Sequence, residues 1–481
     1  MESAEKPSLV RGLGLFAAIS VNIANMIGTG VFLKTRVMTC NVGDASSVIF
    51  VWIFAGLLSG AGALAYAEIA SMMPEAGGDY IFLGRAYGRP ISFLYGWTFF
   101  GVAKAGSQAA LAVGCAIFLN SVLNGGLNPT YFEFNLFGQA VKFGHLTVVA
   151  LSAIWIVAII NCAAVRIGGA TASFLTVIKI GLVIGVAAGA YLFATGDWSH
   201  MSLSNVGGTC ESVAATARGG IAGFGAAMLG ALWAYDGWNN LTPLCGEVRD
   251  PQRNIPRAFF GGMAIVGALY IFANLAYFYV LTPTEIASVP VTSSVATEVM
   301  KRFLGPSAVG LIALAMMVSS FGALHASVLA NSRIPYAMAK EGMFFKPLAD
   351  VSPKSRVPVK AIVAQAAWAS VLAVSGTYDT LTDSVIFASW LFYGLTAGTL
   401  FVLRKRMPDA VRPYRAWGYP ILPILFLIVT TFLIVNTFIA TPTQALMGAA
   451  LMLLGAPFYW YWSRTAVTSV PVTSVEDRSI H

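Results

Sequence analysis

The stretch Met26-Ile27-Gly28-Thr29-Gly30-Val31-Phe32 decides the fold of this chain. It lies in an apolar segment, 13–33, that is long enough to cross a bilayer as a helix at about 1.5 Å per residue. Two glycines around a threonine weaken a helix, because glycine has extra backbone freedom and no side chain to cover the peptide groups. Backbone opened inside a membrane needs partners from protein, water or a ligand. The stretch therefore predicts a broken membrane span.

A second break is predicted in the other half of the chain. The stretch Trp233-Ala234-Tyr235-Asp236-Gly237-Trp238 lies in the apolar segment 219–245, with an acidic residue and a glycine at its middle. Two broken spans in corresponding positions of two halves indicate a binding site near the bilayer midplane, as in secondary transporters.

The composition agrees with a membrane protein. Of the 481 residues, 57% are hydrophobic and 10% are charged, against about 25% charged in ordinary soluble domains. The net charge of +8 does not indicate nucleic acid, because most lysines and arginines fall in alternate loops and the termini. This bias predicts a multi-pass membrane protein with both termini cytoplasmic and an even number of spans. No small-residue cleavage site follows the first apolar run, so no removable signal peptide is expected. The expected location is the plasma membrane.

Twelve segments are expected to span the bilayer, which makes this an all-α membrane protein. Their approximate limits are 13–33, 47–73, 91–123, 146–165, 168–194, 219–245, 258–281, 308–339, 361–375, 380–403, 421–440 and 444–462. Spans 1–5 (13–195) and spans 6–10 (219–403) are of nearly equal length, and an odd number of spans inverts the second unit relative to the first. The remaining parts are the cytoplasmic N-terminus (1–12), spans 11 and 12 (421–463) and the cytoplasmic tail (464–481).

An opened helix offers two kinds of polar group. Amides near Thr29 and Gly30 begin the second half-helix and suit a carboxylate. Carbonyls near Met26 and Ile27, with those of the second break, suit an ammonium group, so the pair of breaks fits an α-amino acid. The alternative is that Gly28 and Gly30 only let two helices approach closely.

Several stretches together resemble a known family, the amino acid–polyamine–organocation superfamily of permeases, and its L-type amino-acid transporter branch. The stretches are 26–32, 74–80, 232–240, 247–257 and 332–342. The resemblance implies a LeuT-type 5+5 inverted repeat plus two C-terminal helices, with helices 1 and 6 broken, working by alternating access. It also implies an aromatic gate at Trp233 and a substrate site formed by Met26, Ile27, Gly28, Thr29, Gly30, Trp233, Ala234, Tyr235 and Asp236.

Lys179 lies well inside span 5, where a lysine costs about 2.5–3.5 kcal/mol on insertion scales and needs a partner. The resemblance implies that its ammonium replaces the sodium ion of sodium-coupled relatives. We expect it to bond span 1 carbonyls near Ile23 or Ala24 and to contact Ser327 or its neighbours. The alternative is that Lys179 extends toward the cytoplasmic surface.

Three other polar residues are expected to be buried, and the sequence allows more than one role for each. Asp236 either selects a cationic side chain, carries a coupled proton, or pairs with Lys104 as structure. Glu68 reads as a gate or interface residue, or else as a proton carrier. His325 is either a titrating group or a hydrogen-bonded packing residue.

The five cysteines show no metal-ligand spacing, and no metal or other cofactor is expected. Cys40 and Cys210 fall in external loops, so a disulfide between them is possible. Mammalian relatives join a heavy chain through an external cysteine between spans 3 and 4. The stretch 124–145 has none, so no disulfide-linked heavy chain is predicted, and the sequence does not define the oligomeric state.

The favoured function is sodium-independent transport of neutral amino acids, by exchange or with protons. A cationic amino-acid or polyamine antiporter that uses Asp236 as counter-charge is the first alternative, and a non-transporting amino-acid sensor is the second. An intramembrane enzyme is not expected, because the chain has no H-E-x-x-H or G-x-S-x-G signature.

Overall fold

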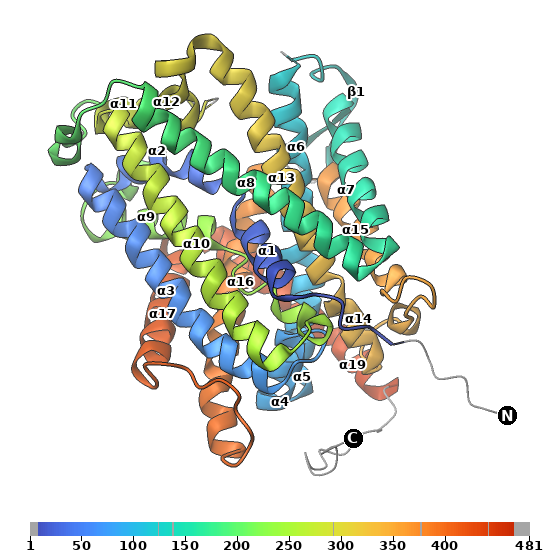
Figure 1. The fold of residues 1–481 in the computed structure, drawn as a ribbon. Helices are drawn as coiled ribbons and strands as arrows, with labels where there is room; N and C mark the ends of the chain where they lie inside the picture. Colours follow the sequence, from blue (N-terminus) through green and yellow to red (C-terminus); the bar gives the residue numbers. More distant parts are fainter. Residues whose placement is uncertain are drawn as a thin grey trace.

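The computed structural model describes residues 8–123, 125–136, 139–291, 293–375, 378–440 and 442–465. Its helices form one bundle, with a two-stranded hairpin at one edge (Figure 1). Most of the predicted cytoplasmic tail, 466–481, and residues 1–7 of the N-terminus lie outside the described residues.

The chain alternates long helices with short turns of helix. The elements of the first half are α1 (Leu15–Met26), α2 (Gly30–Val42), α3 (Ala45–Met72), α4 (Asp79–Tyr87), α5 (Arg89–Thr98), the π-helical η1 (Phe99–Ala103), α6 (Lys104–Val122), β1 (Thr130–Leu136), β2 (Gln139–Gly144), α7 (His145–Ala163), α8 (Val165–Phe193), η2 (Trp198–Ser202) and η3 (Ala215–Ala217). Those of the second half are α9 (Gly220–Tyr235), η4 (Thr242–Glu247), α10 (Pro251–Val280), α11 (Pro283–Ala287), α12 (Val295–Leu304), η5 (Gly305–Ser307), α13 (Ala308–Asn331), α14 (Arg333–Lys340), η6 (Lys346–Ala349), α15 (Val359–Ser375), α16 (Tyr378–Arg406), α17 (Ile421–Ala440), α18 (Pro442–Leu453) and α19 (Gly455–Thr465).

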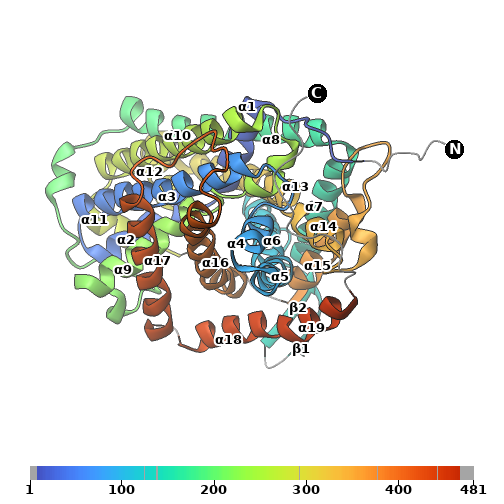
Figure 2. The same cartoon turned by 90° about the horizontal axis from the view of Figure 1, so that it is seen from below.

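Among the described residues, six helical segments are long and apolar enough to cross a membrane, or seven if α1 and α2 count as one bent span. The six are Ala45–Met72, Arg89–Val122, His145–Ala163, Val165–Phe193, Pro251–Val280 and Val295–Lys340. Helices α17, α18 and α19, the predicted spans 11 and 12, lie along one edge of the bundle (Figure 2). The protein is therefore a helical multi-pass membrane protein, and the count of twelve spans remains a prediction.

The first predicted break is present. Helix α1 ends at Met26, α2 begins at Gly30, and the two helices meet at 41°. A Cβ added at Gly30 would lie 2.6 Å from the Cβ of Ala234, whereas one at Gly28 would meet nothing within 4 Å. Gly30 thus serves the close approach of two helices, and Gly28 lies in the opened segment.

The second predicted break is also present. Helix α9 ends at Tyr235, Asp236 leaves the helix at ψ 148°, and Gly237 has φ +96°. That φ favours glycine, and a Cβ there would lie 2.8 Å from Asn25 of α1. The sequence predicts one span to Cys245, but after Asp236 the chain forms turns and the 3-10 helix η4 instead of a second α-helix.

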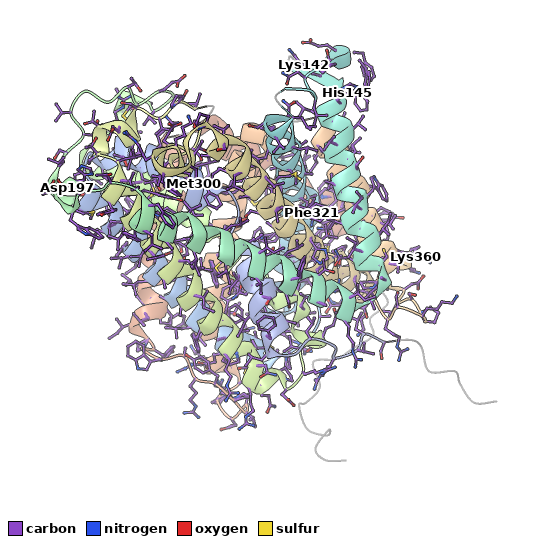
Figure 3. The ribbon with its side chains drawn as sticks, turned by 45° about the horizontal axis from the view of Figure 1, so that its top comes forward. Lys142, His145, Asp197, Met300, Phe321 and Lys360 are labelled. Carbon is purple, nitrogen blue, oxygen red and sulfur yellow. A yellow bond between two sulfur atoms is a disulfide. The ribbon has the colours of Figure 1, made fainter. Side chains whose placement is uncertain are left out.

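The two ends of the bundle differ. One end carries the hairpin β1–β2, in which Glu133 pairs with Lys142 and Phe132 with Phe143; the sequence predicts only turns here. Figure 3 shows Lys142 at this end, which we call the hairpin face. The opposite end carries α4 and α14, and we call it the α4 face (Figure 1). Helix η4 packs on α14.

A disulfide joins Cys40 to Cys210, with the two Cα atoms 5.6 Å apart. It links α2 to the loop before α9. The amide of Gly219 also donates to the carbonyl of Asn41 at 2.7 Å. The half-helices that follow the first break and precede the second are therefore tied together at the end of α2 distant from the break, where Cys40 lies within the helix and not in a loop as predicted.

Candidate functional site

The opened carbonyls of the first break are held by side chains from α8 and α13. The Lys179 ammonium donates to the carbonyl oxygens of Ala24 at 2.8 Å and of Ile27 at 2.7 Å. The Ser319 hydroxyl lies 3.1 Å from both the Ile27 and the Gly28 oxygens. Lys179 is 1% exposed, so the expected bond to Ala24 is confirmed and an extension to the surface is wrong.

The expected contact between Lys179 and Ser327 is also wrong. The Ser327 hydroxyl accepts from Gln108 at 3.3 Å and Asn331 at 3.2 Å. Ser319, which reaches the break, lies eight residues earlier on α13, about 12 Å along the helix. The sequence places a serine on the correct helix but does not define which turn faces α1.

Tyr270 of α10 connects the two breaks. Its hydroxyl oxygen lies 2.9 Å from the Met26 carbonyl oxygen and 2.8 Å from the Ala234 carbonyl oxygen. One hydroxyl proton serves two carbonyls, so the breaks face each other across a single side-chain atom. The sequence does not identify this tyrosine as a site residue, because it is a single hydroxyl-bearing side chain in an otherwise apolar stretch of its span.

Thr29 caps the start of α2, where its carbonyl accepts from Phe32 at 3.1 Å and Leu33 at 3.2 Å. The amides of Gly30 and Val31 open this helix, where the first N–H groups have no intrahelical carbonyl. They lie at the positive end of the helix dipole. This end of the break offers donors, and the end held by Lys179 offers acceptors.

Asp236 and Lys104 are linked through Tyr393 of α16. The Tyr393 hydroxyl donates to Asp236 Oδ1 at 2.7 Å, and the Lys104 ammonium donates to the Tyr393 oxygen at 3.4 Å. Lys104 is 2% exposed. The pairing is thus indirect, and the sequence did not single out Tyr393.

Two aromatic residues of the second break point in different directions. The Trp233 ring centroid lies 5.9 Å from the Lys34 ammonium, a cation–π distance. The Tyr235 hydroxyl instead donates to the Trp52 carbonyl of α3 at 3.3 Å and its side chain is buried. Tyr235 packs α9 on α3.

Glu68 is buried in an ion-pair cluster toward the α4 face. Its carboxylate accepts from Arg404 at 2.6 and 2.9 Å and lies 3.3 Å from Arg412. On the same face Glu247 and Arg333, both with fully buried side chains, form a two-pronged pair at 2.7 and 3.0 Å. These pairs tie α3 to α16 and η4 to α14.

His325 lies among polar backbone and amide groups. Its ring nitrogens are 2.9 Å from the Gly168 carbonyl oxygen and 3.1 Å from Asn161 Nδ2. These contacts join α13 to α7 and α8. In the described part of the chain, no group of three or more His, Cys, Asp or Glu could hold a metal ion.

Discontinuous apolar helices that meet inside a bundle define a multi-pass membrane protein of the secondary-transporter type. The comparisons with known proteins make this specific: the chain belongs to the amino acid permease family, whose model matches residues 13–461. This is a family of transporters and not of enzymes.

Curated relatives cover nearly the whole chain. The serine/threonine exchanger SteT of Bacillus subtilis (strain 168) is 32% identical over 95% of this chain and 98% of its own length. The b(0,+)-type amino acid transporter 1 of Mus musculus is 29% identical over 94% of this chain and 88% of its own. The large neutral amino acids transporter small subunit 2 of Oryctolagus cuniculus is 29% identical over 95% and 81%.

Proposed function

We infer that this protein exchanges neutral amino acids across the plasma membrane by alternating access, without sodium. The observation that carries the proposal is the Tyr270 hydroxyl, which lies within 2.9 Å of a carbonyl from each break. The opened backbone of both helices thus meets at one side-chain atom, and we place the substrate beside it. The amides of Thr29 and Gly30, at the start of α2, receive the substrate carboxylate. The carbonyls of Met26 and of the second break receive its ammonium group.

Sodium independence rests on Lys179. Its ammonium donates to two carbonyl oxygens at the end of α1, so a fixed positive charge already occupies the place where a cation would bind opened carbonyls. A bound sodium ion would have to displace a buried amine from both partners.

The preference for neutral side chains rests on the Asp236 network. Asp236 accepts from Tyr393, behind which lies the buried Lys104 ammonium. A cationic side chain at Asp236 would compete with this bond and meet the repulsion of Lys104. The names of two relatives support this preference for neutral amino acids, since one is a large neutral amino acids transporter and the other is a serine/threonine exchanger.

A cationic substrate is the second candidate. Asp236 is half-buried, so its carboxylate is not sealed from the space between the breaks. An arginine or polyamine carrier would use that carboxylate as counter-charge, with Tyr393 turned away. Comparison of leucine and arginine uptake distinguishes the two candidate functions.

The remaining features of the proposal concern topology. In this proposal the α4 face is cytoplasmic, and the twelve spans form two inverted five-helix units and a C-terminal pair. The excess of basic residues in alternate loops supports this orientation. The buried pairs Glu68–Arg404 and Glu247–Arg333 close this face and must rearrange when it opens. Trp233 covers the substrate from the hairpin side.

The test is counterflow in proteoliposomes that contain the purified protein. Vesicles loaded with unlabelled leucine receive labelled leucine, serine, arginine or glutamate, with sodium or with choline outside. The proposal predicts accumulation of leucine and serine that needs internal substrate and not sodium, and little arginine uptake. Arginine uptake above leucine uptake favours the second candidate. Amino-acid binding without any flux would make the protein a sensor and refute the proposal.

A further inference from the structure

Asp79 is a buried carboxyl group that the proposed function does not use. It begins α4 and is 1% exposed. The loop that carries it packs tightly on the second break: the Gly77 amide donates to the Pro243 carbonyl at 3.1 Å, and a Cβ at Gly78 would lie 2.4 Å from the carbonyl carbon of Thr242. The surroundings of the carboxyl group therefore depend on the position of residues 236–247.

The two oxygens of Asp79 have unequal surroundings. Oδ2 accepts from Tyr95 at 3.1 Å, Asn239 at 3.2 Å and Thr242 at 3.3 Å. Oδ1 is buried and has no hydrogen-bond partner among the described residues. Burying an ionised carboxylate that has one oxygen without a hydrogen bond costs much desolvation free energy, and burying the neutral acid costs less. Burial raises the pKa of Asp79 to about 7, with Lys104 and the three donors opposing it.

The end of α16 and the end of α14 also pack on α4, where Arg406 donates to the Ala86 carbonyl and Glu341 accepts from Tyr80. Four other charged or titratable groups interact electrostatically with Asp79 itself. They are Lys104 at the start of α6, Tyr95 of α5, Tyr66 of α3 and Cys245 of η4. Lys104 is the one cation among them and also faces Asp236. Among the described residues, its ammonium donates to Tyr393 and has no hydrogen bond to either carboxylate. One buried positive charge is thus shared between Asp79 and Asp236.

We propose that Asp79 is a proton-binding site that controls how firmly the α4 face is closed over the second break. This proposal rests on the transport function inferred above. When Asp79 is ionised, its bonds to Asn239 and Thr242 are charge-assisted and strong. When Asp79 takes a proton from solvent, those bonds weaken and the charge of Lys104 interacts with Asp236 alone. The segment after α9 then separates more easily from the loop that carries Asp79.

A cavity of about 630 Å³ lies on the α4 face and is bordered by Ala76, Ile81 and Gly246. These residues are close in sequence to Asp79 and Cys245, and the proposal takes this side as the one from which protons reach the carboxyl group. Since a group with a pKa near 7 changes its neutral fraction about tenfold between pH 6 and pH 8, exchange should be faster at the lower pH.

The experiment is leucine counterflow at equal pH on both sides, from pH 5.5 to 8.5, so that no proton gradient drives the flux. Wild type should exchange about five- to tenfold faster at pH 6 than at pH 8. Asp79→Asn, which cannot ionise, should give a flat profile near the fast rate. Glu75→Gln is the matched control, because Glu75 is an exposed carboxylate on the same loop, and it should keep the wild-type profile. A pH-independent wild type, or an Asp79→Asn variant with the wild-type profile, overturns the proposal.

A second measurement does not depend on folding of the variant. Infrared spectra of wild type labelled with ¹³C-aspartate should show a buried protonated aspartic acid that loses its proton between pH 6 and pH 8. If no aspartate band titrates in that range, the proposal is wrong. If wild type shows this band but no counterflow of any amino acid, the transport function fails while the proton site stands.

Discussion

The ammonium of Lys179 lies 2.7 Å from the carbonyl oxygen of Ile27, the residue that caps the C-terminus of α1. A side chain from α8 therefore holds the end of a half-helix that would otherwise leave its carbonyls bare. Replacement with methionine removes the Lys179 donor from the Ala24 and Ile27 carbonyls, of which Ile27 keeps the Ser319 hydroxyl. A buried carbonyl left without a donor costs about 1–3 kcal/mol. Lys179→Met should lower leucine exchange about tenfold or more.

The control for this variant is Lys301→Met, at an exposed lysine that pairs with Glu298. Exposed ion pairs contribute about 0–1 kcal/mol, so exchange should be unchanged. Full exchange by Lys179→Met, or activity that becomes sodium-dependent in both variants, would contradict the role of Lys179.

Tyr270→Phe tests the bridge between the breaks. Loss of the hydroxyl leaves the Met26 and Ala234 carbonyls without their shared donor, and we expect about a tenfold loss of kcat/KM for leucine. Tyr277→Phe is a close control, because Tyr277 lies on the same helix and its buried hydroxyl has no partner among the described residues. Equal effects of the two variants would refute a special role for Tyr270.

Tyr393→Phe tests the basis of side-chain selectivity. The variant removes the bond from Tyr393 to Asp236 and frees the carboxylate for a cationic substrate. Since a hydrogen bond to a charged group contributes about 1.5–3 kcal/mol, the ratio of arginine to leucine exchange should rise about tenfold. The added change Asp236→Asn should cancel this rise. An unchanged ratio in Tyr393→Phe would show that Asp236 does not face the substrate.

The double variant Cys40→Ser, Cys210→Ser tests the disulfide. The bond closes a loop of 170 residues, for which the chain-entropy account gives about 5 kcal/mol. The midpoint of thermal unfolding should therefore fall. Dithiothreitol should lower the midpoint of wild type toward that of the double variant and leave the double variant unchanged. Equal midpoints for both proteins without reductant would contradict a stabilising bond.

The sequence predicted the features that depend on local chemistry. Both breaks lie where glycine interrupts an apolar segment. A lysine inside a span must find acceptors, but the prediction that they lie on span 1 near Ala24 came from the family resemblance. The disulfide was one of two open outcomes, since sequence does not place two Cα atoms within bonding distance.

Features that depend on helix rotation could not be predicted. Tyr270, Ser319 and Tyr393 reach the breaks because of how α10, α13 and α16 are turned about their axes, and apolar spans carry little signal of rotation. Ser327 was predicted in place of Ser319 for this reason. The hairpin and the short helices α11 and α12 lie in stretches that read as polar loops, since their folding depends on packing against the bundle.

Competition in the counterflow assay tests the central claim most directly. Leucinamide lacks the carboxylate and 2-hydroxy-4-methylpentanoate lacks the ammonium group, yet both keep the leucine side chain. If facing half-helices bind both ends of the amino acid, unlabelled leucine inhibits labelled leucine exchange and neither analogue does so at a tenfold higher concentration. Inhibition by either analogue as strong as that by leucine would contradict the claim.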